Sequence, residues 1–344
     1  MITVGVIGCG YWGPNLLRNF AENESAELRW MCDLDPMRLE VMGRRYPSAE
    51  TTRECEQLFN DPRLDAVVVS TPVGTHYDYA RRALEAGKHV LVEKPLTASE
   101  REAEELIALA AAHGLTLMVD HTFIYTGAVR KIKEIVEGGG LGDLLYFDST
   151  RLNLGLFQPD INVVWDLAPH DLSIMDYILD RRPTSVSATG SCHIRAGIEN
   201  IAYVMLRFPD DFIAHFHFNW LAPVKIRRTL IAGTSKMIVY DDIEPVEKVR
   251  VYDSGVTAGR ADGVDAAEDE REAAYRTLVS YRTGDVWAPK LDTTEALAHV
   301  CREFLGAIRE RRAPLTDGHA GLRVVRLLEA AQASIQRGGQ PVAV

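Results

Sequence analysis

Three glycines near the amino terminus are spaced as G-x-G-x-x-G between two apolar segments. Gly8, Gly10 and Gly13 follow a β-branched run at residues 2–7 and precede a helical pattern that begins at Pro14. In this arrangement the first glycine forms a tight turn, the second lets the backbone approach a pyrophosphate, and the third allows close helix–strand packing. The helix N-terminus then offers free N–H groups and the positive end of its dipole. The spacing predicts dinucleotide binding rather than a plain strand-to-helix connection.

An acidic residue stands at the end of the second apolar run. Asp33 directly follows residues 28–32 and lies twenty residues after Gly13. A carboxylate in this place accepts hydrogen bonds from the adenosine ribose and repels a 2′-phosphate. We therefore expect NAD rather than NADP, although Arg38 is close enough in sequence to favour a phosphate. The other loop residues expected at this site are Tyr11 and Trp12.

The overall composition is that of a soluble globular protein. The chain has 344 residues, 47% hydrophobic and 25% charged, a length that predicts about two domains. The net charge of -11 argues against a nucleic-acid or anionic-membrane partner. No uninterrupted apolar run approaches the ~18 residues of a membrane span. The five cysteines, at positions 9, 32, 55, 192 and 301, lack metal-ligand spacing and favour a reducing, cytoplasmic location.

The first part of the chain alternates strand and helix patterns. Near-continuous apolar strands are expected at residues 66–70, 89–93 and 115–120, with helices at 75–86 and 99–113 between them. Fully apolar strands in such alternation indicate a parallel sheet covered by helices on both faces. We therefore predict a doubly wound α/β Rossmann domain over residues 1–122.

In the second part, strand patterns follow one another with few helices between them, which predicts an α+β domain over residues 123–344. Its long β-type runs indicate a large, mostly antiparallel open sheet. Aromatic residues at 216, 218 and 220 are expected on an exposed face of that sheet, which predicts a homodimer or homotetramer. A loop is expected at 255–272, and the last two helices are expected to return toward the first domain. The runs are 144–152, 184–193, 198–208, 212–221, 228–240 and 248–252, and the helices 294–311 and 320–337.

Two further motifs carry a family resemblance. Glu93-Lys94-Pro95 follows a predicted strand, and Asp166 and His170 form an Asp-x-x-x-His pair. With the glycine loop, they make the chain resemble the glucose-fructose oxidoreductase, inositol dehydrogenase and rhizopine-catabolism (GFO/IDH/MocA) family of NAD(P)-dependent oxidoreductases acting on CH–OH groups. The resemblance spans nearly the whole chain. In the family the proline of this motif often follows a cis peptide, and the sequence leaves the isomer at Pro95 open. Coenzyme contacts that it implies are Ser70, Thr71, Pro72, His76, Glu93 and Lys94.

The three motif residues fit the chemistry that this resemblance implies. Oxidation of an alcohol carbon releases a hydroxyl proton, which the neutral imidazole of His170 can accept. The family pattern gives Lys94 the role of lowering the hydroxyl pKa and supporting the developing negative charge. Asp166 lies on the same helix face and could orient the imidazole or bind a hydroxyl, or it could be only a helix N-cap. Pro169 fits a helix only in its first turn, which predicts that the pair lies at a helix N-terminus.

Substrate identity rests on the residues before Asp166. Val164 and Trp165 are bulky, whereas cyclitol and free-sugar members of the family commonly have glycines shortly before the Asp-x-x-x-His pair. The chain therefore looks like members that act on nucleotide-activated sugars. The ring carbon expected to react is C3. A free cyclitol or sugar and a non-catalytic dinucleotide sensor are the alternatives. Expected substrate contacts are Tyr125, Arg151, Asn153, Asn162, Asp166 and His170.

Two other groups have weaker claims to function. Arg130, Lys131 and Lys133 could face a diphosphate, although a solvated helix face explains them as well. His215 and His217 alternate onto one strand face, but no acidic or cysteine partners accompany them in the sequence, so sheet packing is favoured and no metal is expected.

Overall fold

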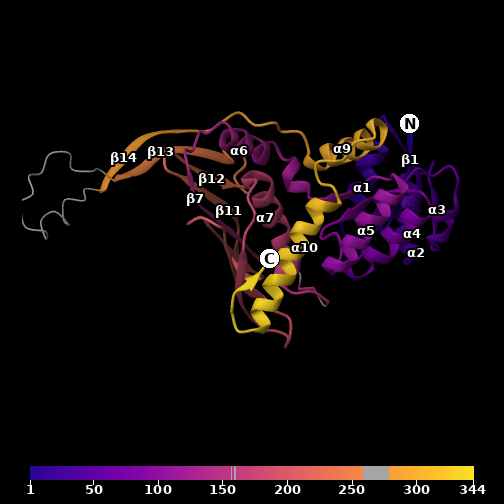
Figure 1. Cartoon of the computed structure of the whole chain (residues 1–344). Coiled ribbons are helices and arrows are strands. Elements are labelled where there is room, and N and C mark those ends of the chain that lie inside the picture. The colour runs from indigo at the N-terminus through magenta and orange to yellow at the C-terminus, as the bar shows by residue number, and fades with distance from the viewer. Residues whose placement is uncertain (156, 159, 259–278) are drawn as a thin grey trace, which may run out of the picture.

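The computed structural model describes all residues except 156, 159 and 259–278 and contains two β-sheets (Figure 1). The first sheet is parallel throughout and has the strand order β3-β2-β1-β4-β5-β6. This order reverses direction between β1 and β4, the arrangement of a dinucleotide-binding Rossmann sheet. Its strands are β1 (Ile2–Ile7), β2 (Ala26–Cys32), β3 (Glu50–Thr52), β4 (Ala66–Val69), β5 (His89–Glu93) and β6 (Leu117–Asp120).

Helices cover both faces of this sheet, which confirms the doubly wound prediction. Successive residues of β4 point to opposite faces, so Val68 lies in one apolar core while Val67 and Val69 lie in the other. Helix α9 (Ala296–Glu310), far along the chain, completes the first core, and its Phe304 ring lies 6.4 Å from Phe20. The other helices are α1 (Gly13–Ala21), α2 (Pro36–Arg45), α3 (Glu56–Asn60), α4 (His76–Glu85) and α5 (Glu100–His113).

The second sheet has the order β14-β13-β12-β11-β7-β10-β9-β8-β15 and is mostly antiparallel, with β7 and β10 parallel. The predicted run at 228–240 is two strands joined by a turn, in which Gly233 N donates to Lys236 O at 3.0 Å. Of the predicted loop at 255–272, residues 255–258 belong to β13 and 259–272 lie outside the described residues. The strands are β7 (Leu144–Leu154), β8 (Ser185–Ser191), β9 (Ile201–Arg207), β10 (Ile213–Asn219), β11 (Leu221–Gly233), β12 (Met237–Asp241), β13 (Val249–Ala258), β14 (Val279–Trp287) and β15 (Val342–Ala343).

Three helices cover one face of the second sheet: α6 (Gly127–Glu137), α7 (Val163–Leu179) and α10 (Gly318–Gln336). Figure 1 shows α10 running between the two sheets, in agreement with its contacts to both α5 and α7. None of the helices in the described part of the chain is long and apolar enough to cross a membrane.

The predicted exposure of the β10 aromatics is wrong. Phe216, Phe218 and Trp220 are fully buried under the helices. Because strand residues alternate between faces, the intervening His215 and His217 lie on the uncovered face instead. There they stack on Tyr203, and His215 Nδ1 lies 2.9 Å from Asp148 Oδ1.

Helix α7 begins earlier than the proline rule predicts. Asn162 is its N-cap, and the side-chain oxygen accepts hydrogen bonds from the N–H groups of Val164 and Trp165. Pro169 therefore lies inside the helix rather than in its first turn, and Asp166 is not the cap. Asp166 and His170 are one helical turn apart, on the same face of α7.

The inward position of Phe216 has a measurable consequence. Phe216→Ala is expected to lower the free energy of unfolding by about 3–5 kcal/mol, because it leaves a cavity in a closely packed core. Ile213→Ala, on the uncovered face of the same strand, is the control and should cost about 1 kcal/mol or less. Denaturant unfolding of both variants tests this, and equal small losses would contradict the inward placement.

Candidate active site

The glycine loop has the geometry that a pyrophosphate cradle requires. Gly8 has φ 99°, and a Cβ atom there would collide with the carbonyl of Ser70. A Cβ on Gly13 would collide with the carbonyl oxygen of Gly8, so this glycine allows α1 to approach the turn. A Cβ on Gly10 would meet, among the described residues beyond its chain neighbours, only the guanidinium of Arg38, with Nη1 at 3.2 Å. The second glycine therefore leaves an open approach to the backbone, as the coenzyme requires.

Asp33 is fixed at the end of β2. Its Oδ2 accepts a hydrogen bond from Cys9 N at 2.7 Å, and its Oδ1 accepts one from Asp35 N at 2.8 Å. Arg38 Nη1 lies 3.7 Å from the same carboxylate. The carboxylate is held where a ribose would lie, which fits NAD, and Arg38 stands beside it as the sequence suggested.

The loops that follow β4 and β5 are held together by a buried histidine. His76 Nδ1 lies 2.8 Å from Pro95 O, and its Nε2 lies 2.7 Å from Thr71 O. The ring is 1% exposed, so His76 positions these two loops and is not free to contact the coenzyme as predicted. Ser70, Thr71 and Pro72 follow β4 at the same edge as the glycine loop, and the Lys94–Pro95 peptide is cis.

Lys94 connects the first sheet to helix α7. Its ammonium donates to the backbone oxygen of Asp166 at 2.9 Å and lies 3.7 Å from Asp166 Oδ1. Trp220 Nε1 donates to the other carboxylate oxygen, Oδ2, at 3.0 Å. Lys94 and Asp166, 72 residues apart in the chain, are therefore brought together as the sequence analysis expected.

His170 lies one turn along α7 and carries an imidazole with unused hydrogen-bonding capacity. Its Nδ1 is buried and has no hydrogen-bond partner within the described residues. Burial, followed by the positive charges of Lys94, Arg151 and Arg227, lowers the pKa of His170 well below its ordinary value. The imidazole is therefore neutral near pH 7 and able to accept a proton.

Two arginine side chains lie over the Phe123 ring, which itself contacts His170. The Phe123 ring is 5.0 Å from the His170 ring, and the guanidinium carbons of Arg151 and Arg227 lie 4.8 and 5.7 Å from the Phe123 centroid. Arg151 is buried and pairs with Asp171 at 2.5 Å. This pairing makes Arg151 a support for the site, and it is not free to bind substrate as predicted.

Two other predicted substrate contacts have structural partners. Tyr125 is fully buried, and its hydroxyl lies 3.0 Å from Thr316 Oγ1. The Asn162 amide caps α7 and donates to Glu199 Oε2 at 2.6 Å. Asn153 differs from both, because its Oδ1 is buried and has no hydrogen-bond partner among the described residues.

Sequence reasoning missed Asp120, whose carboxyl group is beside that of Glu93, one of the expected coenzyme contacts. Glu93 and Asp120 are aligned in the β5–β6 ladder, and Asp120 accepts hydrogen bonds from Thr122 at 2.7 Å and Trp12 at 3.4 Å. Burial first, then the charge of Asp120, raises the pKa of Glu93 well above its ordinary value. Trp12 thus links the glycine loop to Asp120, while the Tyr11 side chain is 87% exposed. The missed signal was the position of Asp120 at a strand's carboxyl end, where parallel-sheet sites form.

The basic residues of α6 have local partners. Lys131 pairs with Glu134 at 2.6 Å and Lys133 with Glu137 at 2.9 Å, while Arg130 lies over the Tyr125 ring. These contacts favour a solvated helix face over a diphosphate site.

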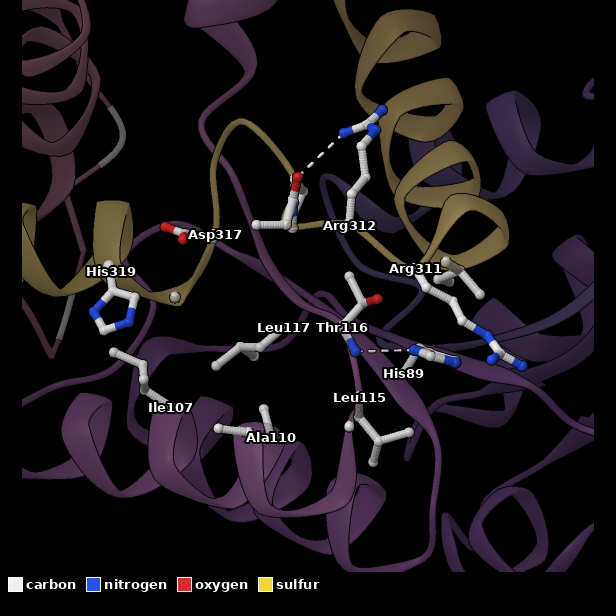
Figure 2. A pocket seen from close by; sticks show the side chains of 16 residues that line it. His89, Ile107, Ala110, Leu115, Thr116, Leu117, Arg311, Arg312, Asp317 and His319 are labelled. Carbon is white, nitrogen blue, oxygen red and sulfur yellow. Dashed lines mark hydrogen bonds between the residues drawn. The ribbon is translucent and has the colours of Figure 1, made fainter.

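A groove of about 590 Å³ lies away from these residues (Figure 2). It is lined by His89, Leu117, Arg311, Arg312 and His319, between α5 and the segment that joins α9 to α10. His89 and Leu117 are the first residues of β5 and β6, so the groove is at the amino ends of the strands. The glycine loop and Lys94 follow the carboxyl ends, and this groove is therefore not the coenzyme site.

The Rossmann sheet and its glycine loop define a dinucleotide-binding protein, and Lys94 lies against the turn of α7 that precedes His170. The family models agree: residues 2–121 match the oxidoreductase family with an NAD-binding Rossmann fold, and residues 129–239 match the GFO/IDH/MocA C-terminal domain. The chain belongs to the GFO/IDH/MocA family of oxidoreductases and binds NAD.

Three curated relatives illustrate the similarity. The uncharacterized oxidoreductase YdgJ of Escherichia coli is 30% identical over 72% of this chain and 73% of its own. UDP-N-acetylglucosamine 3-dehydrogenase of Acidithiobacillus ferrooxidans is 27% identical over 93% of both chains. The NADP(+) scyllo-inositol 2-dehydrogenase IolW of Bacillus subtilis is 26% identical over 97% of this chain and 93% of its own. The solved structure of UDP-N-acetylglucosamine 3-dehydrogenase GnnA from Acidithiobacillus ferrooxidans covers 98% of both chains with a TM-score of 0.79 at 24% identity.

Two glycines of the loop, Gly10 and Gly13, separate folding from coenzyme binding. Gly13→Ala is expected to destabilise the fold by about 1–3 kcal/mol, because the new methyl group meets the Gly8 carbonyl. Gly10→Ala should leave stability nearly unchanged and weaken NAD binding by about tenfold or more. Gly74→Ala is the control, since among the described residues beyond its chain neighbours no atom would lie within 4 Å of the new Cβ. Thermal unfolding and calorimetric titration with NAD measure both effects, and unaltered NAD affinity in Gly10→Ala would contradict the cradle.

Proposed function

We propose that the protein transfers a hydride between NAD and a ring carbon, C3, of a nucleotide-activated sugar. The observation that supports this most is the convergence of Lys94, Asp166 and His170 at the sheet edge that carries the glycine loop. A protein that only senses a dinucleotide has no need of an ammonium and a neutral imidazole beside the coenzyme.

The proposed roles follow from the charges. Bound NAD supplies the hydride acceptor. In the oxidation direction His170 takes the hydroxyl proton, because burial and neighbouring cations keep its imidazole neutral. The Lys94 ammonium lies beside the reacting oxygen and stabilises the negative charge that develops there. Asp166 holds Lys94 in place, and Trp220 holds Asp166.

The substrate class draws on the relatives and on α7. UDP-N-acetylglucosamine 3-dehydrogenase aligns with nearly the whole chain, which favours a nucleotide-linked sugar oxidised at C3. IolW, with a cyclitol substrate, aligns as completely at similar identity, so a free cyclitol is the second candidate. Val164 is buried in the core and does not narrow the site, whereas Trp165 is partly exposed one residue before Asp166. Trp165 is thus the bulky side chain that favours the nucleotide sugar.

The uncovered face of the second sheet supports a proposal of self-assembly. Tyr203 is 47% and Ile213 36% exposed there, opposite the helix-covered face. A second copy of the chain would cover this face, giving a homodimer or homotetramer.

The cysteines support a reducing, cytoplasmic setting. All five, Cys9, Cys32, Cys55, Cys192 and Cys301, are free thiols. An exposed free thiol such as Cys192 persists most readily where glutathione keeps thiols reduced.

Activity against a substrate panel tests the proposed chemistry. The panel contains UDP- and dTDP-sugars, their keto forms and inositols, with NAD or NADH, followed by nicotinamide absorbance. Lys94→Ala and His170→Ala are each expected to lower kcat by about 10²–10⁴-fold. Lys131→Ala, a paired lysine on α6, is the control and should retain activity. Unchanged activity in both active-site variants would refute these roles, and turnover of inositols alone would favour the cyclitol.

The pH profile tests the charge environment of His170. Because the base must be neutral, oxidation is lost as pH falls through the His170 pKa, which is lowered in this site. Arg227→Gln removes one lowering charge and should move the acid limb of kcat/KM to higher pH. Arg228→Gln, an exposed neighbour paired with Asp241, is the control and should leave the limb in place. Identical limbs in all three proteins would contradict His170 as the base.

Light scattering tests the proposed assembly. A mass of two or four chains is expected at micromolar concentration, because a second copy would cover the exposed Tyr203 and Ile213 side chains of the uncovered sheet face. Tyr203→Glu with Ile213→Glu should shift the mass toward the monomer, while Glu substitution of exposed Met37 on α2 should not. A monomeric wild-type protein would overturn this proposal.

A further inference from the structure

A second histidine in the site has no role in the mechanism above. His121 is 1% exposed, yet neither of its ring nitrogens has a hydrogen-bond partner within the described residues. A neutral imidazole carries one N–H donor and one acceptor nitrogen. Leaving both nitrogens unsatisfied in the interior is unfavourable, because each loses its hydrogen bonds to water. Such an arrangement persists where a bound molecule satisfies the ring.

The fold places His121 in the part of the site that holds Lys94 and His170. The β5–β6 ladder pairs Glu93 with Asp120, and Lys94 and His121 are the residues that directly follow this last pair. Two residues after His121, the Phe123 ring contacts the ring of His170. The charge of Lys94 acts on His121, and His121 acts on His170, so the three side chains lie within electrostatic reach of one another.

We propose that His121 binds the hydroxyl group on the carbon next to the one that is oxidised. This inference rests on the proposed function and names a requirement on its substrate, a ring with two adjacent oxygen substituents. A hydroxyl both donates and accepts a hydrogen bond, so it can pair with whichever ring nitrogen faces it, the N–H donor or the acceptor. A carboxylate or a phosphate offers acceptors alone and could pair only with the N–H nitrogen.

The proposed role is binding rather than proton transfer. Burial and the charges of Lys94 and Arg323 lower the pKa of His121 to about 3, so the ring stays neutral throughout the working range of the enzyme. It therefore contributes hydrogen bonds in a fixed direction and leaves the acid limb of the activity to His170. Removal of the His121 ring nitrogens is expected to raise KM and to leave the pH profile unchanged.

Two variants of His121 test the inference with UDP-N-acetylglucosamine and scyllo-inositol as probes. His121→Phe keeps the ring size and removes both polar atoms, while His121→Asn keeps a donor and an acceptor. We expect His121→Phe to raise KM for the probe turned over by at least tenfold, with kcat within about threefold and the acid limb unchanged. His121→Asn should recover part of the loss. His113→Phe, on the exposed end of α5, is the matched control.

A deoxy analogue makes the test specific. The probe lacking the hydroxyl on a carbon next to the reacting one should be a poorer substrate for the wild type. For His121→Phe, parent and analogue should have the same KM, because the partner of the missing hydroxyl is already gone. Calorimetry with NAD and thermal unfolding should show unaltered coenzyme affinity and folding. If His121→Phe does not fold, the comparison of wild type with His121→Asn serves the same purpose.

The outcomes separate this inference from the proposed function. Wild-type turnover with an unchanged KM in His121→Phe would overturn the inference alone, and would mean that buried water satisfies the ring. A fall in kcat with a shifted acid limb would also overturn it, since His121 would then exchange protons. No wild-type turnover of any substrate in the panel would refute the proposed function, and the inference with it.

Discussion

The contact between the Lys94 ammonium and helix α7 is the constraint on which the site depends. Lys94 ends the fifth strand of one sheet, whereas Asp166 and His170 belong to a helix packed on the other. The ammonium donates to the Asp166 carbonyl at 2.9 Å and so fixes the first turns of α7 over the coenzyme edge. Trp220, buried beneath the second sheet's helices, holds the Asp166 carboxylate from the other side. The two sheets are joined here because Lys94 follows a strand of the first and bonds to a helix that packs on the second.

The two basic groups of the site, His170 and Lys94, have different charged neighbours. Arg151 and Arg227 are balanced by Asp171 and Asp242, so their charges are retained in the interior without being free. Their positive potential disfavours a protonated His170 while leaving a neutral imidazole unaffected. Lys94 is partly exposed and lies 3.7 Å from the Asp166 carboxylate. An ammonium beside a neutral base is the combination that alcohol oxidation requires.

Much of the fold could be predicted from local patterns. The Rossmann half follows from apolar strands that alternate with amphipathic helices, and from glycines whose side chains the turn cannot accommodate. Lys94, Asp166 and His170 were found through motifs. The errors have a common cause, because they concern which face a side chain takes once distant elements pack. Phe216 and Phe218 turned inward when α7 and α10 covered one face of the sheet, and Tyr125 became a core residue bonded to Thr316. His121 could not be predicted because nothing local marks an unpaired buried imidazole. Its position follows from the pairing of Asp120, the residue before it, with Glu93 in the β5–β6 ladder.

The central claim is that an ammonium from one sheet and an imidazole from the helix of another meet beside the reacting carbon of the coenzyme. A crystal structure with NADH and a bound sugar tests it most directly. The account predicts that Lys94 Nζ and the His170 ring both lie within hydrogen-bond distance of one sugar hydroxyl, next to C4 of the nicotinamide. A nicotinamide ring bound away from both groups, or the two groups pointing into separate solvent regions, would contradict it.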